Sequence, residues 1–358
     1  MRRPWFIAVP VGFLMLGLVL INKGWNASDQ SLNIQSKELS TSVRNGVRYL
    51  VKALKEDHTT LACYVGGRKV EGLHGYGHVF ALHFMVNAIE NILTTSEKAR
   101  LATRIRLMRR EGLWGYTMSA PVDSDDTAFA LRLLSILGEK LEPEAYHYLM
   151  RFYNPKQRVF RTFLKGTRDD MPRVPSVSGN LAAHPEVNAN ILLLLHNLGE
   201  TLPVDVNHIV SASQAGDGSL VSYFYPSPYY AAIWLLPLIA DKANLKTALH
   251  RVVAHIHEKQ NSNGSCGASS NAYDTALALN ALNAVSIWDE AYRRGVSYLV
   301  GEQRSDGSWR SNEVIWRYVA EDRPKRVWEA YDNYGVITTS LAVQAIRAYL
   351  KAFPSPVI

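Results

Sequence analysis

The sequence predicts an all-α fold: an (α/α)6 toroid of six helix hairpins, preceded by one N-terminal transmembrane helix. Three observations lead to this expectation: an apolar helix signature that recurs six times, amphipathic segments that alternate with it, and an uncharged stretch near the N-terminus. With 358 residues, 47% of them hydrophobic, the chain can bury one large core. We divide it into a transmembrane signal anchor at residues 4–22, a polar tether at 23–39 and a toroid at 40–352.

The N-terminal stretch has the length of a membrane-spanning helix. Residues 4–22 carry no charge, and Arg2 and Arg3 precede them. A bilayer is crossed by about 17 to 25 mainly apolar residues, and no small-residue cleavage site of a signal peptide follows the stretch. We therefore expect an uncleaved anchor. Because the arginine pair should remain on the cytosolic side, we expect the toroid on the non-cytosolic side of the membrane.

A short sequence pattern marks the start of each expected inner helix. Residues 126–131 read DTAFAL, and residues 274–279 read DTALAL. Fainter copies, with a polar or aromatic residue at the Thr position, start at four further places: His78, Asn188, Tyr230 and Thr339. Each copy opens an apolar segment that we expect to be helical, over residues 79–93, 127–137, 187–198, 229–239, 273–285 and 336–350.

Amphipathic segments lie between the apolar ones and supply the expected outer helices. Their charges fall on one face, over residues 43–54, 97–108, 143–152, 204–213, 245–260 and 289–302. An inner ring of apolar helices inside an outer ring of amphipathic ones lets each hairpin bury its apolar face against its neighbours. We expect essentially no sheet.

Three carboxylates crowd the start of the second inner helix. Residues 121–128 read PVDSDDTA, which places Asp123, Asp125 and Asp126 within four residues. A structural interpretation is available, because Asp126 matches Asp274 in another repeat and Asp is a favoured helix cap, with an acidic first turn that complements the helix dipole. A chemical interpretation is also available, because three carboxylates at a cavity rim cannot all ionise cheaply and one should hold a proton at neutral pH.

The acidic segment resembles a known catalytic signature. Residues 123–128, DSDDTA, are similar to the DxDD-T-A signature of class II terpene cyclases, the group that contains squalene–hopene cyclase. The resemblance implies that Asp125 is the Brønsted acid that protonates a terminal alkene or epoxide of a polyprenyl chain. It also implies that Asp123 and Asp126 hydrogen-bond to this acid and tune it.

A second segment resembles the same family. Residues 294–309 have the order basic, Gly, aromatic, aliphatic, Gln and Gly-x-Trp, which is similar to the QW motif of squalene–hopene cyclases and their relatives. The resemblance implies that Gln303 caps backbone groups at a helix end and that Trp309 stacks on it. Weaker versions of the motif begin at Gln214 and Gln260.

Aromatic and histidine side chains near the helix starts complete the candidate site. A carbocation is stabilised by aromatic faces, and the candidates for substrate contact are Trp114, Tyr116, Tyr230, Trp234 and Tyr334. Other aromatic residues nearby are Tyr223, Phe224, Tyr225, Tyr229 and Tyr331. His184 is the candidate support for the acid, because it precedes Asn188 by four residues, as Asp123 precedes Thr127; His78 is a second candidate.

Charge and cysteine content exclude other classes of protein. The net charge is 39 − 32 = +7, but the basic residues never form a long run, so we expect no nucleic-acid partner. Cys63 and Cys266 stand without CxxC or HExxH motifs, which argues against a structural zinc site and leaves their pairing open. Residues 169–173 read DDMPR rather than the metal-binding DDxxD. We expect no metal and no cofactor.

The sequence therefore favours a terpene-cyclase-like protein that cyclises or isomerises a polyprenyl substrate. Two alternatives stay open: a non-catalytic membrane-anchored toroid that binds a lipid or protein partner, and a carbohydrate-active (α/α)6 enzyme with two carboxylates flanking a glycosidic bond. The family builds its pocket between two helical domains, and this chain has length for one. A second chain that completes the pocket is therefore among the partners to consider, beside the lipid substrate and the membrane.

Overall fold

A computed structural model describes residues 36–70, 78–116, 121–141, 144–164, 184–201, 203–320 and 326–354. The expected anchor at residues 4–22, most of the tether and the DDMPR segment lie outside these residues. Within the described part, no helix is both long enough and apolar enough to cross a bilayer.

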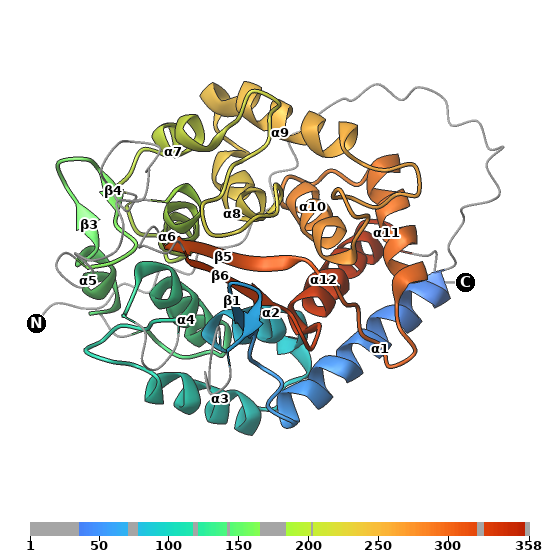
Figure 1. Cartoon of the computed structure of the whole chain (residues 1–358), viewed down its shortest axis with the longest axis horizontal. Helices are drawn as coiled ribbons and strands as arrows, with labels where there is room; N and C mark the ends of the chain where they lie inside the picture. Colours follow the sequence, from blue (N-terminus) through green and yellow to red (C-terminus); the bar gives the residue numbers. More distant parts are fainter. Residues whose placement is uncertain are drawn as a thin grey trace, which may run out of the picture. The chain divides into compact units, whose positions relative to one another are not determined.

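The two expected sets of helices are both present in the described residues (Figure 1). The inner set is α2 (His78–Ile89), α4 (Ser124–Ile136), α6 (Pro185–Asn197), α8 (Tyr230–Ile239), α10 (Ala272–Ala284) and α12 (Val336–Ala352). The outer set is α1 (Ser36–Lys55), α3 (Thr95–Leu107), α5 (Ala145–Met150), α7 (Val206–Ser213), α9 (Lys246–Glu258) and α11 (Glu290–Glu302). Short 3-10 turns follow α2 (Glu90–Ile92) and precede α9 (Ala243–Leu245).

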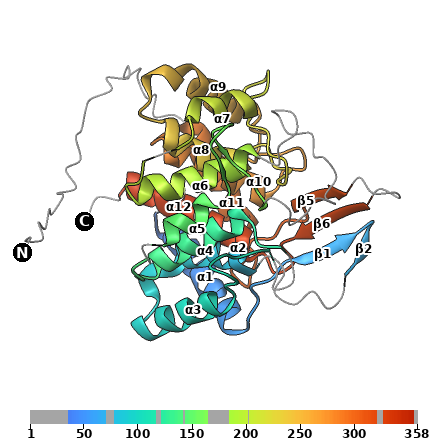
Figure 2. The ribbon, with the colours of Figure 1, turned by 90° about the vertical axis from the view of Figure 1, so that its left-hand side faces the viewer.

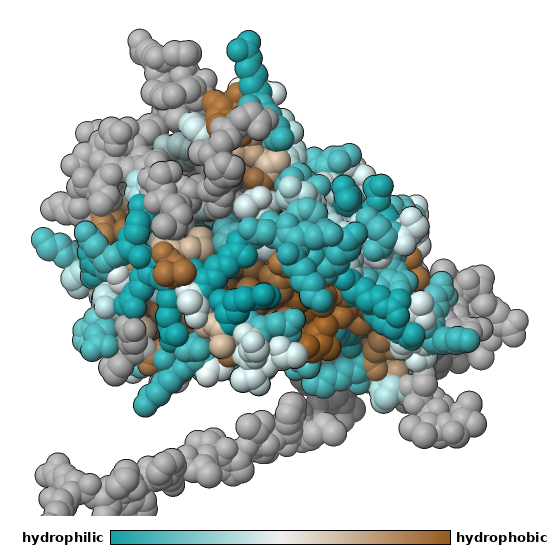
Figure 3. Space-filling model, turned by 90° about the horizontal axis from the view of Figure 1, so that it is seen from below, coloured by the Kyte–Doolittle hydropathy of each residue, from teal (hydrophilic) through white to brown (hydrophobic). Residues whose placement is uncertain are grey.

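The outer helices are amphipathic, as the sequence predicts. In α1, for example, Leu39, Leu50 and Ala53 are buried, whereas the charged residues between them face outward. Figure 3 shows the side of the molecule that lies below in Figure 1: hydrophilic side chains cover most of it and surround a hydrophobic area near its middle.

The last repeat meets the first and closes the ring. Helix α12 packs against both α1 and α2, and the guanidinium of Arg347 donates to the carbonyl of Ala88. The side-chain amide of Gln303 donates to the carbonyls of Ser42, in α1, at 2.9 Å and of Gly307 at 3.0 Å. Gln303 thus joins the end of α11 to the first outer helix, in keeping with the capping role that the QW resemblance implies.

The repeat pattern in the sequence corresponds to a repeated hydrogen bond. The Thr or Asn that marks an inner helix accepts a backbone N–H from the segment that precedes that helix. Four such bonds are Trp114 to Thr127 at 3.1 Å, Phe160 to Asn188 at 2.8 Å, Cys266 to Thr275 at 2.8 Å and Trp309 to Thr339 at 2.9 Å. These positions are therefore structurally equivalent.

The turns after the outer helices α9 and α11 require glycine. Gly264 and Gly307 both have φ of +87°, and a Cβ there would lie 2.4 Å from the carbonyl oxygen of Arg294 and 2.5 Å from that of Asn45. Only glycine tolerates both the left-handed backbone and so close an approach to the next outer helix. These turns therefore fix the distance between successive hairpins.

The expectation of essentially no sheet is wrong. An antiparallel sheet of order β2-β1-β6-β5 is built from β1 (Ala62–Val65), β2 (Arg68–Lys69), β5 (Val314–Ala320) and β6 (Arg326–Tyr331), and β3 (Tyr153–Asn154) pairs with β4 (Val159–Phe160). Figure 1 shows β1, β5 and β6 crossing the centre of the ring, and Figure 2 shows them on one side of the helices. The larger sheet therefore covers one mouth of the toroid. No disulfide joins Cys63, in β1, to Cys266.

Candidate active site

The acidic turn begins one inner helix and is held by the chain on both sides. Asp123 is the N-cap of α4, and its carboxylate accepts the backbone N–H of Asp126 at 2.7 Å. Its own N–H donates to the carbonyl of Trp114 at 2.9 Å, and the N–H of Ser124 donates to that of Thr162 at 2.9 Å. These bonds fix the backbone that carries Asp125.

The position of the cap corrects the structural interpretation of Asp126. The caps of α4 and α10 are Asp123 and Asn271, each of which accepts the backbone N–H three residues on. Asp126 and Asp274 stand at those third positions instead. The apolar pattern reveals the buried face of a helix, but its polar first turn starts where a side chain can satisfy the exposed N–H groups.

Asp125 is buried and held by two polar partners. The side-chain amide of Asn190, in α6, donates to Oδ1 at 2.8 Å, and the hydroxyl of Tyr225, just before α8, bonds Oδ2 at 2.9 Å. Burial raises the pKa of Asp125 to about 6, although both hydrogen bonds and the nearby Arg132 act in the opposite direction. Because the amide N–H of Asn190 can only donate, Oδ1 acts as its acceptor, and a proton on Oδ2 can be donated to the Tyr225 hydroxyl.

Asp123 and Asp126 form a second carboxyl pair. Both are buried, and burial together with the neighbouring negative charge raises the pKa of Asp126 well above its usual value. Burial also raises the pKa of Asp123, to about 7, although the backbone N–H of Asp126 that it accepts acts in the opposite direction. The pair therefore shares a proton at neutral pH, and Asp125 titrates beside this pair.

A buried positive charge lies behind the acid. An N–H of the Arg132 guanidinium donates to the carbonyl of Asn190 at 2.7 Å. The guanidinium carbon Cζ lies 4.8 Å from the centre of the Trp234 ring. Burial lowers the pKa of Arg132 only to about 10, so it stays charged at neutral pH. Arg132 therefore stabilises the anion of Asp125 once a proton has left.

Sequence reasoning missed three residues of this site: Arg132, Asn190 and Glu186. Glu186 is 1% exposed, and Oε1 accepts the backbone N–H groups of Tyr223 and Phe224, both at 2.9 Å. Burial raises the pKa of Glu186 to about 7. Glu186 precedes its repeat marker by two residues, as Asp125 does, so the repeat alignment contained a signal that could have found it.

The candidate aromatic residues divide into two groups. Tyr230 stacks on Tyr225 with centroids 3.6 Å apart, and Trp234 contacts Arg132, so both lie beside residues that surround the acid. Tyr116 stacks on Trp316 of β5 at 5.1 Å.

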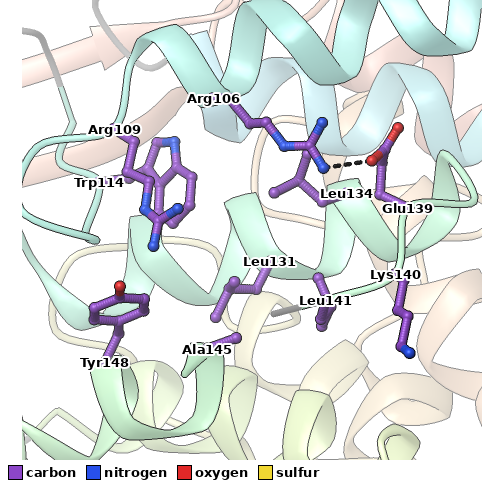
Figure 4. Close-up of a pocket in the computed structure, with 10 residues that line it drawn as sticks. All are labelled: Arg106, Arg109, Trp114, Leu131, Leu134, Glu139, Lys140, Leu141, Ala145 and Tyr148. Atoms are coloured by element: carbon purple, nitrogen blue, oxygen red, sulfur yellow. Dashed lines mark hydrogen bonds and ion pairs between the residues drawn. The ribbon is translucent and has the colours of Figure 1, made fainter. Parts of the chain in front are cut away.

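Trp114 and Tyr334 have other surroundings. The indole N–H of Trp114 donates to the carbonyl of Ile105 at 2.8 Å, and the ring lines a pocket between α3, α4 and α5 that Figure 4 shows, with the Arg106–Glu139 ion pair at its edge. Tyr334 stacks on His58 at 4.1 Å.

His184 lies at the expected rim as the N-cap residue of α6. Its Nδ1 pairs with the hydroxyl of Thr162 at 2.6 Å, and its ring stacks on Tyr223 at 4.5 Å. Burial lowers the pKa of His184 to about 3, so the ring is neutral. Nε2 has no hydrogen-bond partner among the described residues. His78 pairs through Nδ1 with Thr59 at 2.7 Å. Support of the acid by either histidine stays a prediction.

Comparison with known proteins gives the fold a name. No family model matches the chain. In solved structures, the type II terpene cyclase MstE from Scytonema, in complex with geranylgeranyl dihydroxybenzoate, matches with a TM-score of 0.71 and 16% identity, over 89% of this chain and 99% of that one. The chain has the fold of the class II terpene cyclases. The ent-copalyl diphosphate synthase from Streptomyces platensis matches with a TM-score of 0.55 and 19% identity, over 75% of this chain and 50% of that one.

A curated relative agrees with this terpene-cyclase-like fold. The ent-copalyl diphosphate synthase of Streptomyces sp. (strain KO-3988) is 29% identical over 224 residues, 59% of this chain. The chain spans only 40% of that relative's length. MstE, by contrast, is matched over 99% of its chain. The terpene-cyclase-like toroid that the sequence suggests is therefore confirmed. Among the described residues, no group of three or more His, Cys, Asp or Glu side chains is placed to hold a metal ion.

Proposed function

We propose that this chain is a terpene-cyclase-like enzyme that cyclises or isomerises a polyprenyl substrate, with Asp125 as the general acid. The observation that carries the proposal is the state of Asp125, a buried carboxyl with Oδ1 occupied by Asn190 and the proton position directed to Oδ2. The likeness of the fold to class II terpene cyclases supports it. A carboxyl that served only to cap a helix would not need this environment, because Asp123 already caps α4.

The reaction begins with transfer of the Oδ2 proton to a terminal double bond or epoxide. The carboxylate left on Asp125 keeps its bond from Asn190, gains a full donor bond from the Tyr225 hydroxyl and is stabilised by Arg132. The new carbocation is attacked by the next double bond of the chain, and loss of a proton ends the sequence, so no net proton is consumed. Aromatic rings stabilise positive charge, and two of them lie beside Tyr225. The ring centroids of Phe80 and Tyr230 are 5.6 Å and 3.6 Å from that of Tyr225.

Product formation by the purified full chain in detergent tests the proposal. The substrates are squalene, geranylgeranyl diphosphate and geranylgeranyl dihydroxybenzoate. We expect product from at least one of them, loss of product in Asp125→Asn and retention in Asp274→Asn, which changes a buried carboxyl at another repeat. Absence of product with wild type on every polyprenyl substrate would favour a toroid that binds a lipid or a protein without catalysis.

We further propose that residues 4–22 anchor the chain in a membrane, with the toroid on the non-cytosolic side. The uncharged length and the preceding arginine pair support this. In sealed vesicles of known orientation, an external protease should digest the toroid only when the non-cytosolic face is outside. Digestion from the cytosolic face alone would reverse the orientation.

A further inference from the structure

The β5–β6 hairpin is fastened to the rim that carries Asp125. The backbone N–H of Arg317, in β5, donates to the carbonyl of Phe224 at 2.7 Å. The neighbouring indole of Trp316 is parallel to the ring of Phe224, with centroids 5.9 Å apart, and it also stacks on Tyr116. Figures 1 and 2 show β5 and β6 across the mouth of the ring. The hairpin therefore lies over the mouth at which α4 and α6 begin.

The two faces of this hairpin differ in character. The register places Trp316 opposite Ala330, and Tyr318 opposite Trp328, so aromatic residues share one face of the two strands. On the other face Arg317 pairs with Glu329, and their charged groups are 2.8 Å apart. Because Trp316 stacks on Phe224 and Tyr116, the aromatic face is the one turned toward the ring.

One residue, Phe224, connects the hairpin to the segment that leads to the acid. The N–H of Phe224 donates to Glu186 in α6, and its carbonyl accepts from Arg317 in the hairpin. The next residue is Tyr225, whose hydroxyl bonds Oδ2 of Asp125 at 2.9 Å. The hairpin thus touches the segment that carries the partner of the acid proton.

We propose that the β5–β6 hairpin forms the outer wall of the substrate site and that Trp316 is a specificity-determining residue that contacts the hydrocarbon chain. This rests on the proposed function and deepens it. Protonation of an alkene requires that water be kept away from the acid, and a ring mouth has no cover of its own. A hydrocarbon gains affinity by leaving water for an aromatic surface. The aromatic face of the hairpin can exclude water from the acid and can also contact the hydrocarbon, at the rim that carries Asp125.

Binding measurements in a catalytically silent background test this wall. The full chain with Asp125→Asn, in detergent, is titrated with radiolabelled geranylgeranyl diphosphate and with squalene. Trp316→Ala is added to remove the indole, and Arg317→Ala is the matched control, because it changes the next residue on the opposite face and keeps the backbone N–H that bonds Phe224. We expect Trp316→Ala to weaken binding of at least one probe about tenfold or more, and Arg317→Ala to change it less than about twofold.

The outcomes separate the wall from the function. If the Asp125→Asn parent binds a probe and the added Trp316→Ala change leaves that affinity unaltered, the proposal that the hairpin is a wall of the site is refuted, while the proposed function stands. If the parent binds neither probe and wild type forms no product, both are overturned. Should Trp316→Ala melt far below the parent, Trp316→Thr replaces it, because Thr favours strands and also lacks the ring. Undiminished affinity in a folded Trp316→Thr protein would overturn the wall just as plainly.

Discussion

Replacement of Asp125 by Asn should abolish turnover and at the same time stabilise the protein at high pH. Asn has the shape of a protonated Asp, so its oxygen can accept from Asn190 and its NH2 group can donate to the Tyr225 hydroxyl. It has no proton that an alkene can take. Chemistry is therefore lost at every pH, while the hydrogen-bonded frame of the site is kept.

The stability gain follows from the raised pKa of Asp125, which is about 6 in the fold against 3.8 ordinarily. The folded state then binds the proton more tightly, so this contribution to stability is complete below pH 3.8 and is lost as pH rises through 6. Two pKa units at about 1.4 kcal/mol each give a loss on the order of 3 kcal/mol in wild type by pH 8. Asp125→Asn avoids this loss.

Urea unfolding of both proteins at pH 4 and pH 8 measures the effect. The free energies of unfolding of wild type and variant should differ little at pH 4, and the variant should exceed wild type by roughly 3 kcal/mol at pH 8. The comparison cancels the titrating groups that do not interact with Asp125, because these are common to both proteins. An equal difference at the two pH values would refute the argument from burial, and persistent turnover in the variant would refute Asp125 as the acid.

Three further changes test separate parts of the site and ring. Tyr225→Phe removes a hydrogen bond that favours ionised Asp125, so Asp125 becomes a weaker acid and kcat should fall about tenfold or more. The alkaline limb of the pH–rate profile should move to higher pH, and an unmoved limb would argue against contact between Tyr225 and the acid. Glu186→Gln should raise the free energy of unfolding at pH 8.5, but not near pH 4, by on the order of 3 kcal/mol, because burial raises the pKa of this carboxyl to about 7; a loss of stability at both pH values would contradict this. Gln303→Ala should cost about 1 to 2 kcal/mol in chemical unfolding and speed amide exchange in α1, since it breaks one of the bonds that close the ring; unchanged exchange would show that closure rests on the other contacts.

The helices could be predicted because each repeat carries its own local signal. Apolar residues at helical spacing and a marker such as Thr127 or Thr275 are present within single segments, and these two markers accept a hydrogen bond from residues only 13 and 9 positions before them. The ring followed because six apolar faces have to be buried together. The β5–β6 hairpin escaped notice although residues 314–320 read VIWRYVA, in which Trp316 and Tyr318 alternate with Arg317. That alternation is short, and it sits between two strong helical repeats.

The partners of the acid could not be predicted in the same way. Asn190 is 65 residues from Asp125 and Tyr225 is 100 residues away, and only the packing of successive inner helices brings the three together. Burial decides the chemistry of the triplet as well. The sequence shows three similar carboxyls, whereas the structure makes Asp123 the cap of α4, Asp126 a buried carboxyl with a raised pKa beside that cap, and Asp125 a separate acid with its own hydrogen bonds.

The acid site lies at a repeat whose inner helix carries a charged residue where another inner helix carries a neutral one. Five residues after its marker, α10 has Asn280, whose amide donates to the carbonyl of Leu341 in the next inner helix at 2.9 Å. At the same offset α4 has Arg132, which donates to the carbonyl of Asn190 in the next inner helix at 2.7 Å. The same interhelical bond is thus made twice, once by a neutral amide and once by a buried cation. Because a buried cation has a lower free energy beside an anion, Arg132 favours the ionised form of Asp125 at this repeat alone. The charge that stabilises the spent acid also fastens α4 to α6, so its removal should affect both stability and the pH dependence of turnover, whereas removal of the Asn280 amide should affect stability only.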